Sequence, residues 1–196
     1  MEDVKKRSKD YIRDVETILG KMEKDFPVKA VEIVSVLMEA RDSGRRVYVL
    51  GNGGSASTAS HMASDLNKGA NRKDAPRFKA VALTENTPLM LAWANDSSYE
   101  DVFVEQLRNH LEPNDVVICI SGSGNSVNIL KAAEYANSKG AATIGLTGFD
   151  GGKLSKIARV SYIVPCQCMQ QVEDIHLLIE HMLSLILRDS PECSKG

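Results

Sequence analysis

RVYVLGNGGSASTASHMASDLNKG, residues 46–69, is the stretch that decides the fold. It opens with four apolar residues, 47–50, whose composition is typical of a buried parallel strand. Glycines and an asparagine at 51–54 then interrupt the chain, and Ser55 stands where a helix N-cap is expected. A strand, a glycine-rich turn and a helix N-terminus form a common anion-binding arrangement, because free backbone amides and the helix dipole point at the turn.

The helix expected after this turn carries His61 and Asp65, four residues apart, so both side chains lie on one face and can share a ligand. The turn lacks the third glycine of the dinucleotide-binding fingerprint and the Gly-Lys-Ser/Thr of nucleoside-triphosphate loops. Glycine turns of this kind occur in every doubly wound fold, and most bind nothing. At this point a purely structural turn and an anion site are equally good interpretations.

Composition predicts a single cytoplasmic domain. The 196 residues carry a net charge of −2, which argues against a general nucleic-acid or membrane partner. No run of 18 apolar residues is present, and the charged first ten residues are unlike a signal peptide. The cysteine spacing fits neither a disulfide framework nor a zinc motif, so reduced thiols are expected at Cys119, Cys166, Cys168 and Cys193.

Apolar periodicity predicts an α/β fold in which strands and helices alternate. Two amphipathic helices, 4–24 and 28–41, are expected to be separated at Pro27, and a further helix is expected over 99–111. We divide the chain into N-terminal helices (1–45, the first a candidate subunit contact), a main domain (46–189) and a disordered tail (190–196). Five strands predict a parallel sheet covered by helices on both faces, and they are 47–50, 78–83, 116–120, 142–146 and 160–164.

A second glycine turn follows the strand at 116–120. Ser121, Ser123 and Ser126 surround two glycines just before a helix expected over 127–138. Hydroxyls and backbone amides without a lysine or arginine suit a phosphate monoester better than a nucleotide. A serine–glycine turn without a ligand is the alternative. Because both turns follow strand carboxyl ends, where ligands of such sheets collect, the repetition favours a binding site.

The last helix, expected over 170–188, carries Glu173 and His181. At about 100° per residue these side chains fall roughly 80° apart on the helix, with Leu177 between them. Spacing alone favours packing or surface roles for both. It also favours such roles for His110 and His176.

Four separated motifs resemble one family. GNGGSASTASHMASDL, ISGSGNSVNILKAAEYA, LTGFDGG and VEDIHLLIEHML occur in the order and spacing of the phosphoheptose (sedoheptulose-7-phosphate) isomerases of the sugar isomerase (SIS) superfamily. The resemblance covers about residues 5 to 188. It implies a homotetramer of flavodoxin-like α/β subunits with active sites at subunit interfaces and a divalent metal, zinc in the better-known members. It also implies conversion of sedoheptulose 7-phosphate to D-glycero-D-manno-heptose 7-phosphate, an early step towards bacterial surface glycans.

The resemblance also implies the residues of the site. Asp65 is the expected base, His181 the second acid/base group, and Glu173 a second carboxylate that can take over as base. The metal positions match His61, Asp65, Glu173 and His181. The substrate positions match Asn52, Gly53, Gly54, Ser55, Asp65, Asn95, Asp96, Ser121, Gly122, Ser123, Ser126 and Glu173.

Three positions depart from the family's commonest pattern. Asp65 stands in place of glutamate, Glu173 in place of glutamine, and Gly122 in place of threonine. Asp65 shortens the reach of the base by ~1 Å, a displacement large enough to matter in catalysis. A set of two histidines and two carboxylates suits zinc, while harder metals such as manganese become more competitive.

Three other functions compete with this reading. One is a non-catalytic phosphosugar-binding protein, like the superfamily member that binds the replication initiator, and another is an isomerase of a different sugar phosphate. The histidines and carboxylates argue against the first. A phosphosugar-sensing regulator is disfavoured because the sequence shows no DNA-binding segment.

Overall fold

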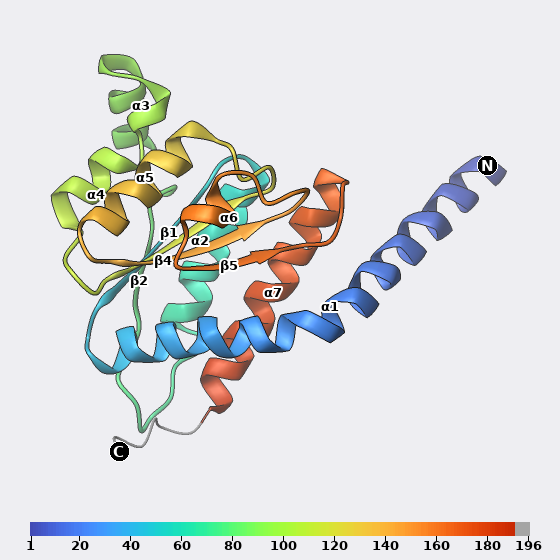
Figure 1. Ribbon diagram of the computed structural model, residues 1–196, viewed down its shortest axis with the longest axis horizontal. Helices are drawn as coiled ribbons and strands as arrows, with labels where there is room; N and C mark the ends of the chain where they lie inside the picture. The colour runs from blue at the N-terminus through green and yellow to red at the C-terminus, as the bar shows by residue number, and fades with distance from the viewer. Residues whose placement is uncertain (191–196) are drawn as a thin grey trace.

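The computed structural model describes residues 1–190 and is built on a five-stranded, all-parallel sheet (Figure 1). The strands follow the order β2-β1-β3-β4-β5, which is the flavodoxin-like arrangement. Every residue of β3 and β4 is buried, because helices cover both faces of these central strands. The expected fold class is confirmed, and the strands are β1 (Arg46–Gly51), β2 (Lys79–Ala82), β3 (Val116–Ser121), β4 (Ala142–Thr147) and β5 (Val160–Ile163).

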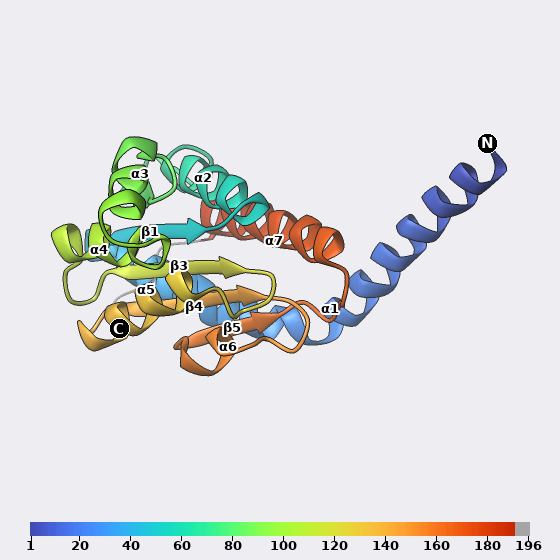
Figure 2. The same ribbon diagram turned by 90° about the horizontal axis from the view of Figure 1, so that it is seen from above.

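Two hydrophobic cores lie on opposite faces of the sheet. On one face α1 (Glu2–Asp42), α2 (Gly54–Asn67) and α7 (Met169–Asp189) contribute the buried side chains. On the other face α4 (Val104–His110), α5 (Val127–Ser138) and α6 (Leu154–Ile157) contribute them. Figure 2 shows the sheet between these helices. The carboxyl ends of β1 and β3 are paired, so the turns that follow them meet at one edge of the sheet.

Helix α1 is one continuous helix, so the prediction of two helices separated at Pro27 is wrong. Proline removes one backbone hydrogen bond but does not forbid a helix that tertiary packing supports. Met22, Phe26, Ala30 and Ile33 are buried at helical spacing on both sides of Pro27, and this packing carries the helix through it. Figure 1 shows α1 changing direction between its docked and projecting parts, as helices that contain proline do.

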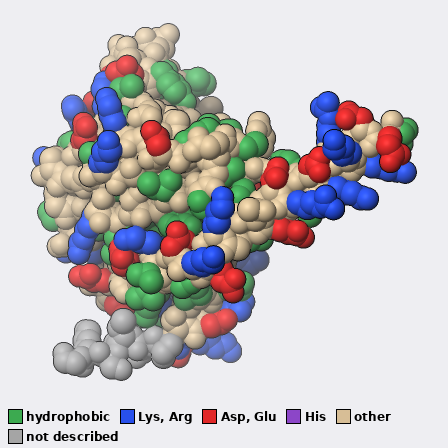
Figure 3. Space-filling model, turned by 45° about the vertical axis from the view of Figure 1, so that its right-hand side comes forward, with side chains coloured by type: hydrophobic (Ala, Val, Ile, Leu, Met, Phe, Trp, Pro, Cys, Tyr) green, Lys and Arg blue, Asp and Glu red, His purple; other side chains and the backbone are tan. Residues whose placement is uncertain are grey.

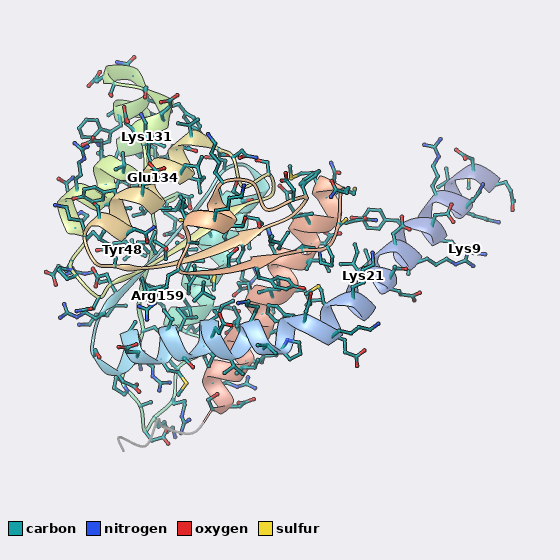
Figure 4. All side chains as sticks on the ribbon, in the orientation of Figure 1. Lys9, Lys21, Tyr48, Lys131, Glu134 and Arg159 are labelled. Carbon is teal, nitrogen blue, oxygen red and sulfur yellow. The ribbon has the colours of Figure 1, made fainter. Side chains whose placement is uncertain are left out.

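The N-terminal part of α1 projects from the body, and its first buried residue is Ile18. Before that point Val4 and Ile12 are 61% and 58% exposed. Charged side chains cover the visible face of this segment in Figure 3, and Figure 4 labels Lys9 there. Tyr11 Oη links this segment to the body by donating a 2.5 Å hydrogen bond to the Asp174 carboxylate.

Helix α3 (Thr87–Asp96) also projects, and none of its residues is buried. The single helix expected over 99–111 is instead a 3-10 turn, η1 (Tyr99–Asp101), followed by α4. Lys131 of α5, labelled in Figure 4, holds η1 with ion pairs to Glu100 (2.9 Å) and Asp101 (3.0 Å). These carboxylates raise the pKa of Lys131.

Strand β2 forms one edge of the sheet, and Asn67 of α2 covers part of it. The Asn67 side chain donates to the Ala80 carbonyl (2.8 Å) and accepts from the Ala80 N–H (3.0 Å). Within residues 1–190, no helix is both long and apolar enough to cross a membrane. Beyond Ser190, the tail expected from the sequence lies outside the described residues.

Candidate active site

A pocket of about 260 Å³ opens where the two glycine turns meet. It is lined by the turn that follows β1, by the end of β3 and the loop after it, and by the start of α7. Most of the predicted substrate residues therefore line one cavity, although they come from three separate segments. The lining residues are Asn52, Gly53, Gly54, Ser55, Ile120, Ser121, Gly122, Ser123, Ser126, Met169 and Glu173.

The serine loop, residues 121–126, is held by the loop at 148–152. Gly148 N donates to Gly122 O (2.8 Å), and Leu154 N donates to Gly124 O (2.9 Å). Gly124 has a positive φ of 64°, and a side chain there would collide with the Gly151 backbone. The motif LTGFDGG thus shapes the serine loop. Ser126 is the N-cap of α5, so the free amides of that helix start at the loop.

Met169 explains why position 122 is a glycine. A side chain at Gly122 would collide with the Met169 sulfur, so methionine takes the space that a larger residue at position 122 would need. A side chain at Gly54 would likewise collide with the Glu173 carboxylate. The pocket wall from α7 therefore packs closely on both glycine turns.

A second cluster lies farther along α2 and α7. His61, Asp65, Glu180 and His181 each offer one ligand atom, and these four atoms lie within 4.8 Å of one another. The two histidine Nε2 atoms are 3.1 Å apart, and His181 Nε2 is 3.5 Å from a Glu180 carboxylate oxygen. Both histidines are exposed, whereas Glu180 is buried. The cluster is thus a group of ligand atoms that solvent reaches from the histidine side.

Glu180 is the electrostatically unusual member of this cluster. Its side chain is fully buried, and among the described residues no donor bonds either of its carboxylate oxygens. Burial and the neighbouring Asp65 carboxylate raise the pKa of Glu180 to about 8. When protonated, Glu180 can donate to Asp65, which is how two such close carboxyls avoid repulsion. A bound cation would satisfy both carboxylates in their ionised form.

The cluster fits a divalent metal ion. Two nitrogen ligands at zinc distances of about 2.0–2.1 Å stand roughly 3.4 Å apart in tetrahedral geometry, close to the separation of the histidine nitrogens. Two imidazoles with two carboxylates form a donor set that zinc accepts. The buried, unpartnered Glu180 carboxylate is the group that gains most from such a cation.

The structure places the predicted metal ligands in two groups. His61, Asp65 and His181 lie in the cluster, with Glu180 where the sequence predicted Glu173. Glu173 lies in the pocket against Gly54. Eight residues separate Glu173 from His181, or ~12 Å along the helix axis, which accounts for their different surroundings.

Asn95 and Asp96, predicted to bind substrate, are exposed at the end of α3 and do not line the pocket of their own chain. Asn95 Nδ2 instead donates to the Asp96 carboxylate (2.7 Å). Sequence reasoning also missed Glu180 and Met169. Glu180 directly precedes His181, and its burial depends on how α2 packs on α7, which no local pattern reveals.

Comparisons with known proteins agree with this architecture. The sequence model of the SIS domain family matches residues 10–148. A phosphoheptose isomerase of Rhodospirillum rubrum is 36% identical, over 81% of this chain and 84% of that protein. A phosphoheptose isomerase of Geotalea daltonii is 35% identical, over 91% of this chain and 93% of that protein.

The likeness extends to three dimensions. The structure of a phosphoheptose isomerase from Neisseria gonorrhoeae superposes with a TM-score of 0.89 at 27% identity, covering 95% of this chain and 100% of that one. The SIS match covers more than half of the chain, and both sequence relatives are matched over most of their length. This chain belongs to the phosphoheptose isomerase family of SIS domain proteins.

Proposed function

We propose that this protein is an isomerase that interconverts sedoheptulose 7-phosphate and D-glycero-D-manno-heptose 7-phosphate. The observation that carries the proposal is a phosphate-type loop on one side and a histidine–carboxylate cluster two helical turns away, in a chain whose relatives are named phosphoheptose isomerases. The product is a precursor of surface-glycan heptoses. The chain acts in the cytoplasm under this proposal.

The spacing of the two parts suits a seven-carbon substrate. Gly54 in the pocket and His61 in the cluster are seven residues apart on α2, or ~10.5 Å along its axis. Seven carbons joined by bonds of about 1.5 Å span roughly 8 Å when extended, before the phosphate is added. With the phosphate at Ser121, Ser123 and Ser126, in the pocket that Gly54 also lines, a substrate of this length would extend carbons 1 and 2 towards the cluster.

The chemistry assigned to the cluster is a proton transfer between neighbouring carbons. Asp65 takes the proton from one carbon and returns it to the next, through an enediolate-like intermediate. His181 moves the proton between the two oxygens. Glu173, in the pocket wall, is the second carboxylate available as base. A divalent ion, zinc in this proposal, would be held by His61, Asp65, Glu180 and His181, where it would supply Lewis-acid polarisation of the carbonyl.

We further propose that the working form is a homotetramer whose subunits complete one another's sites. The histidine side of the cluster is exposed, and so are Asn95 and Asp96 on α3. A neighbouring subunit over this face would exclude water from the reacting carbons. The same assembly would carry Asn95 and Asp96 to a neighbour's pocket.

Incubation of the purified protein with sedoheptulose 7-phosphate in D₂O tests the function. We expect the aldose 7-phosphate to form and to carry deuterium at carbon 2, because the transferred proton exchanges with solvent. Product analysis by NMR reports both. If the protein binds the sugar phosphate without turning it over, it is a binding protein instead. If it isomerises only a different sugar phosphate, the proposed substrate is wrong.

A further inference from the structure

Asn52 opens the first glycine turn and lines the pocket, and its side-chain amide is already held by the protein. Asn52 Nδ2 donates to Asn128 Oδ1, and Asn128 Nδ2 donates back to Asn52 Oδ1, both at 2.9 Å. Tyr99 Oη donates to the same Asn52 oxygen at 2.8 Å. Asn128 is only 3% exposed, so this pair joins the pocket to the buried side of α5.

A backbone N–H fixes the orientation of both amides. The oxygen and nitrogen of an asparagine have nearly the same shape, so only the hydrogen-bond network distinguishes them. Ile129 N donates to Asn128 Oδ1 at 3.0 Å, and a backbone N–H can only donate. The Asn128 oxygen must therefore face Ile129. Asn52 must then direct its nitrogen at that oxygen and its own oxygen at Asn128 Nδ2 and Tyr99.

The remaining bonding capacity of Asn52 follows by counting. Its oxygen accepts two hydrogen bonds, from Asn128 and Tyr99, which use both acceptor positions. Its nitrogen has two N–H groups, and one of them is used by Asn128. One N–H is left. We propose that Asn52 contacts its ligand as a donor only, and that Asn128 and Tyr99 are positioning residues that impose this role.

The ligand atom opposite Asn52 is therefore an acceptor oxygen of the sugar phosphate, as a carbonyl, hydroxyl or phosphate oxygen provides. A group that can only donate, such as the ammonium of an amino sugar, finds no acceptor on Asn52. Fixing the amide in advance also removes the cost of ordering it on binding. This inference rests on the proposed function only in that the ligand is a sugar phosphate.

A double-mutant cycle separates positioning from folding. We expect Tyr99→Phe and Asn128→Ala to raise KM for sedoheptulose 7-phosphate about 3-fold and about 10-fold, as loss of roughly one hydrogen bond implies. kcat should change less. In an Asn52→Ala background both effects on KM should vanish, while any loss of Tm from Asn128→Ala should persist. Tyr135→Phe, which removes a hydroxyl from α5 away from the pocket, is the matched control.

Asn52→Asp tests the donor assignment directly. This variant keeps the shape of the side chain but has no N–H, so its affinity should be no higher than that of Asn52→Ala. Near-wild-type affinity of Asn52→Asp would overturn the assignment. So would effects of Tyr99→Phe and Asn128→Ala that survive in the Asn52→Ala background.

Calorimetric binding of sedoheptulose 7-phosphate provides a readout that does not need turnover. Suppose that the wild type binds this sugar phosphate without isomerising it, and that the variants change the affinity as expected. The proposed function then fails and the role of Asn52 stands. If the wild type isomerises the sugar phosphate and the substitutions change neither KM nor affinity, the proposed function stands and the role of Asn52 fails. A wild type that binds no sugar phosphate refutes both.

Discussion

Glu173 and Glu180 lie on one helix seven residues apart, yet their surroundings assign them different work. Glu180 is buried beside Asp65 and two histidines, whereas Glu173 faces the pocket beside Gly54. The sequence resemblance implied that Glu173 binds the metal, because the family motif is read position by position. Only the packing of α2 on α7 shows that Glu180 has its carboxylate among the histidines.

Metal content distinguishes the two carboxylates. We expect Glu180→Gln and His61→Ala to lose a divalent ion that the untagged wild type carries, because each removes a charged or nitrogen ligand from the cluster. Glu173→Gln should keep the ion. Elemental analysis by mass spectrometry provides the measurement, and loss of the ion in Glu173→Gln alone would restore Glu173 as the ligand.

His176 contributes to the pH dependence of the free energy of unfolding. Burial lowers the pKa of His176 to about 4, although its Nε2 lies 3.2 Å from the Thr147 carbonyl. Between pH 4 and 6.5 the unfolded chain binds a proton at His176 that the folded chain does not bind, so the contribution of His176 to the free energy of unfolding falls as the pH falls through this window. The raised pKa of Glu180, about 8, gives a contribution of the opposite sign as the pH falls from 8 towards 4.5. The full contribution of His176 to the free energy of unfolding is about 3 kcal/mol.

Urea unfolding at several pH values measures this effect. Relative to the wild type, His176→Gln should become more stable as the pH falls from 6.5 to 4, because it lacks the His176 contribution and keeps that of Glu180. His110→Gln, which changes an exposed histidine, is the control and should match the wild type. An unchanged pH profile in His176→Gln would show that the buried imidazole does not control it.

At the scale of elements, the serine loop predicts where the phosphate is bound. Ser123→Ala and Ser126→Ala should each raise KM about 10-fold or more, since a hydrogen bond to a charged group contributes ~1.5–3 kcal/mol. Ser138→Ala, at the other end of α5, removes a hydroxyl that donates to the Tyr135 carbonyl and serves as the control. Phosphate-ester inhibitors that bind the loop variants as tightly as wild type would contradict the assignment.

Elements set by local sequence were predictable, and elements set by distant packing were not. The strands and both glycine turns follow from apolar runs and glycine positions, and they lie where expected. The helix break predicted at Pro27 is absent because side chains on both sides of the proline are buried against the body. Asn128 and Tyr99 could not be found because their partner, Asn52, is far away in sequence.

At the scale of the whole molecule, the projecting part of α1 predicts assembly. Residues 1–14 are all exposed within the chain, although Val4, Tyr11 and Ile12 are apolar. Deleting these residues should leave a folded body, because burial on α1 begins at Ile18, but should shift the protein to smaller assemblies. Light scattering with chromatography measures the mass, and a wild type that is monomeric and fully active would refute the tetramer.

The pairing of Asn67 with Ala80 determines how the sheet meets other chains. An uncovered edge strand is a template for aggregation, because its free N–H and C=O groups accept a strand from any neighbour. The Asn67 amide occupies those groups at Ala80, as one residue of a sixth strand would. Val81 beside it is 44% exposed, so without this pairing the edge would present both apolar surface and free backbone groups. A single asparagine thus removes one backbone donor and one acceptor from the exposed edge, which makes pairing with a strand of another chain less favourable.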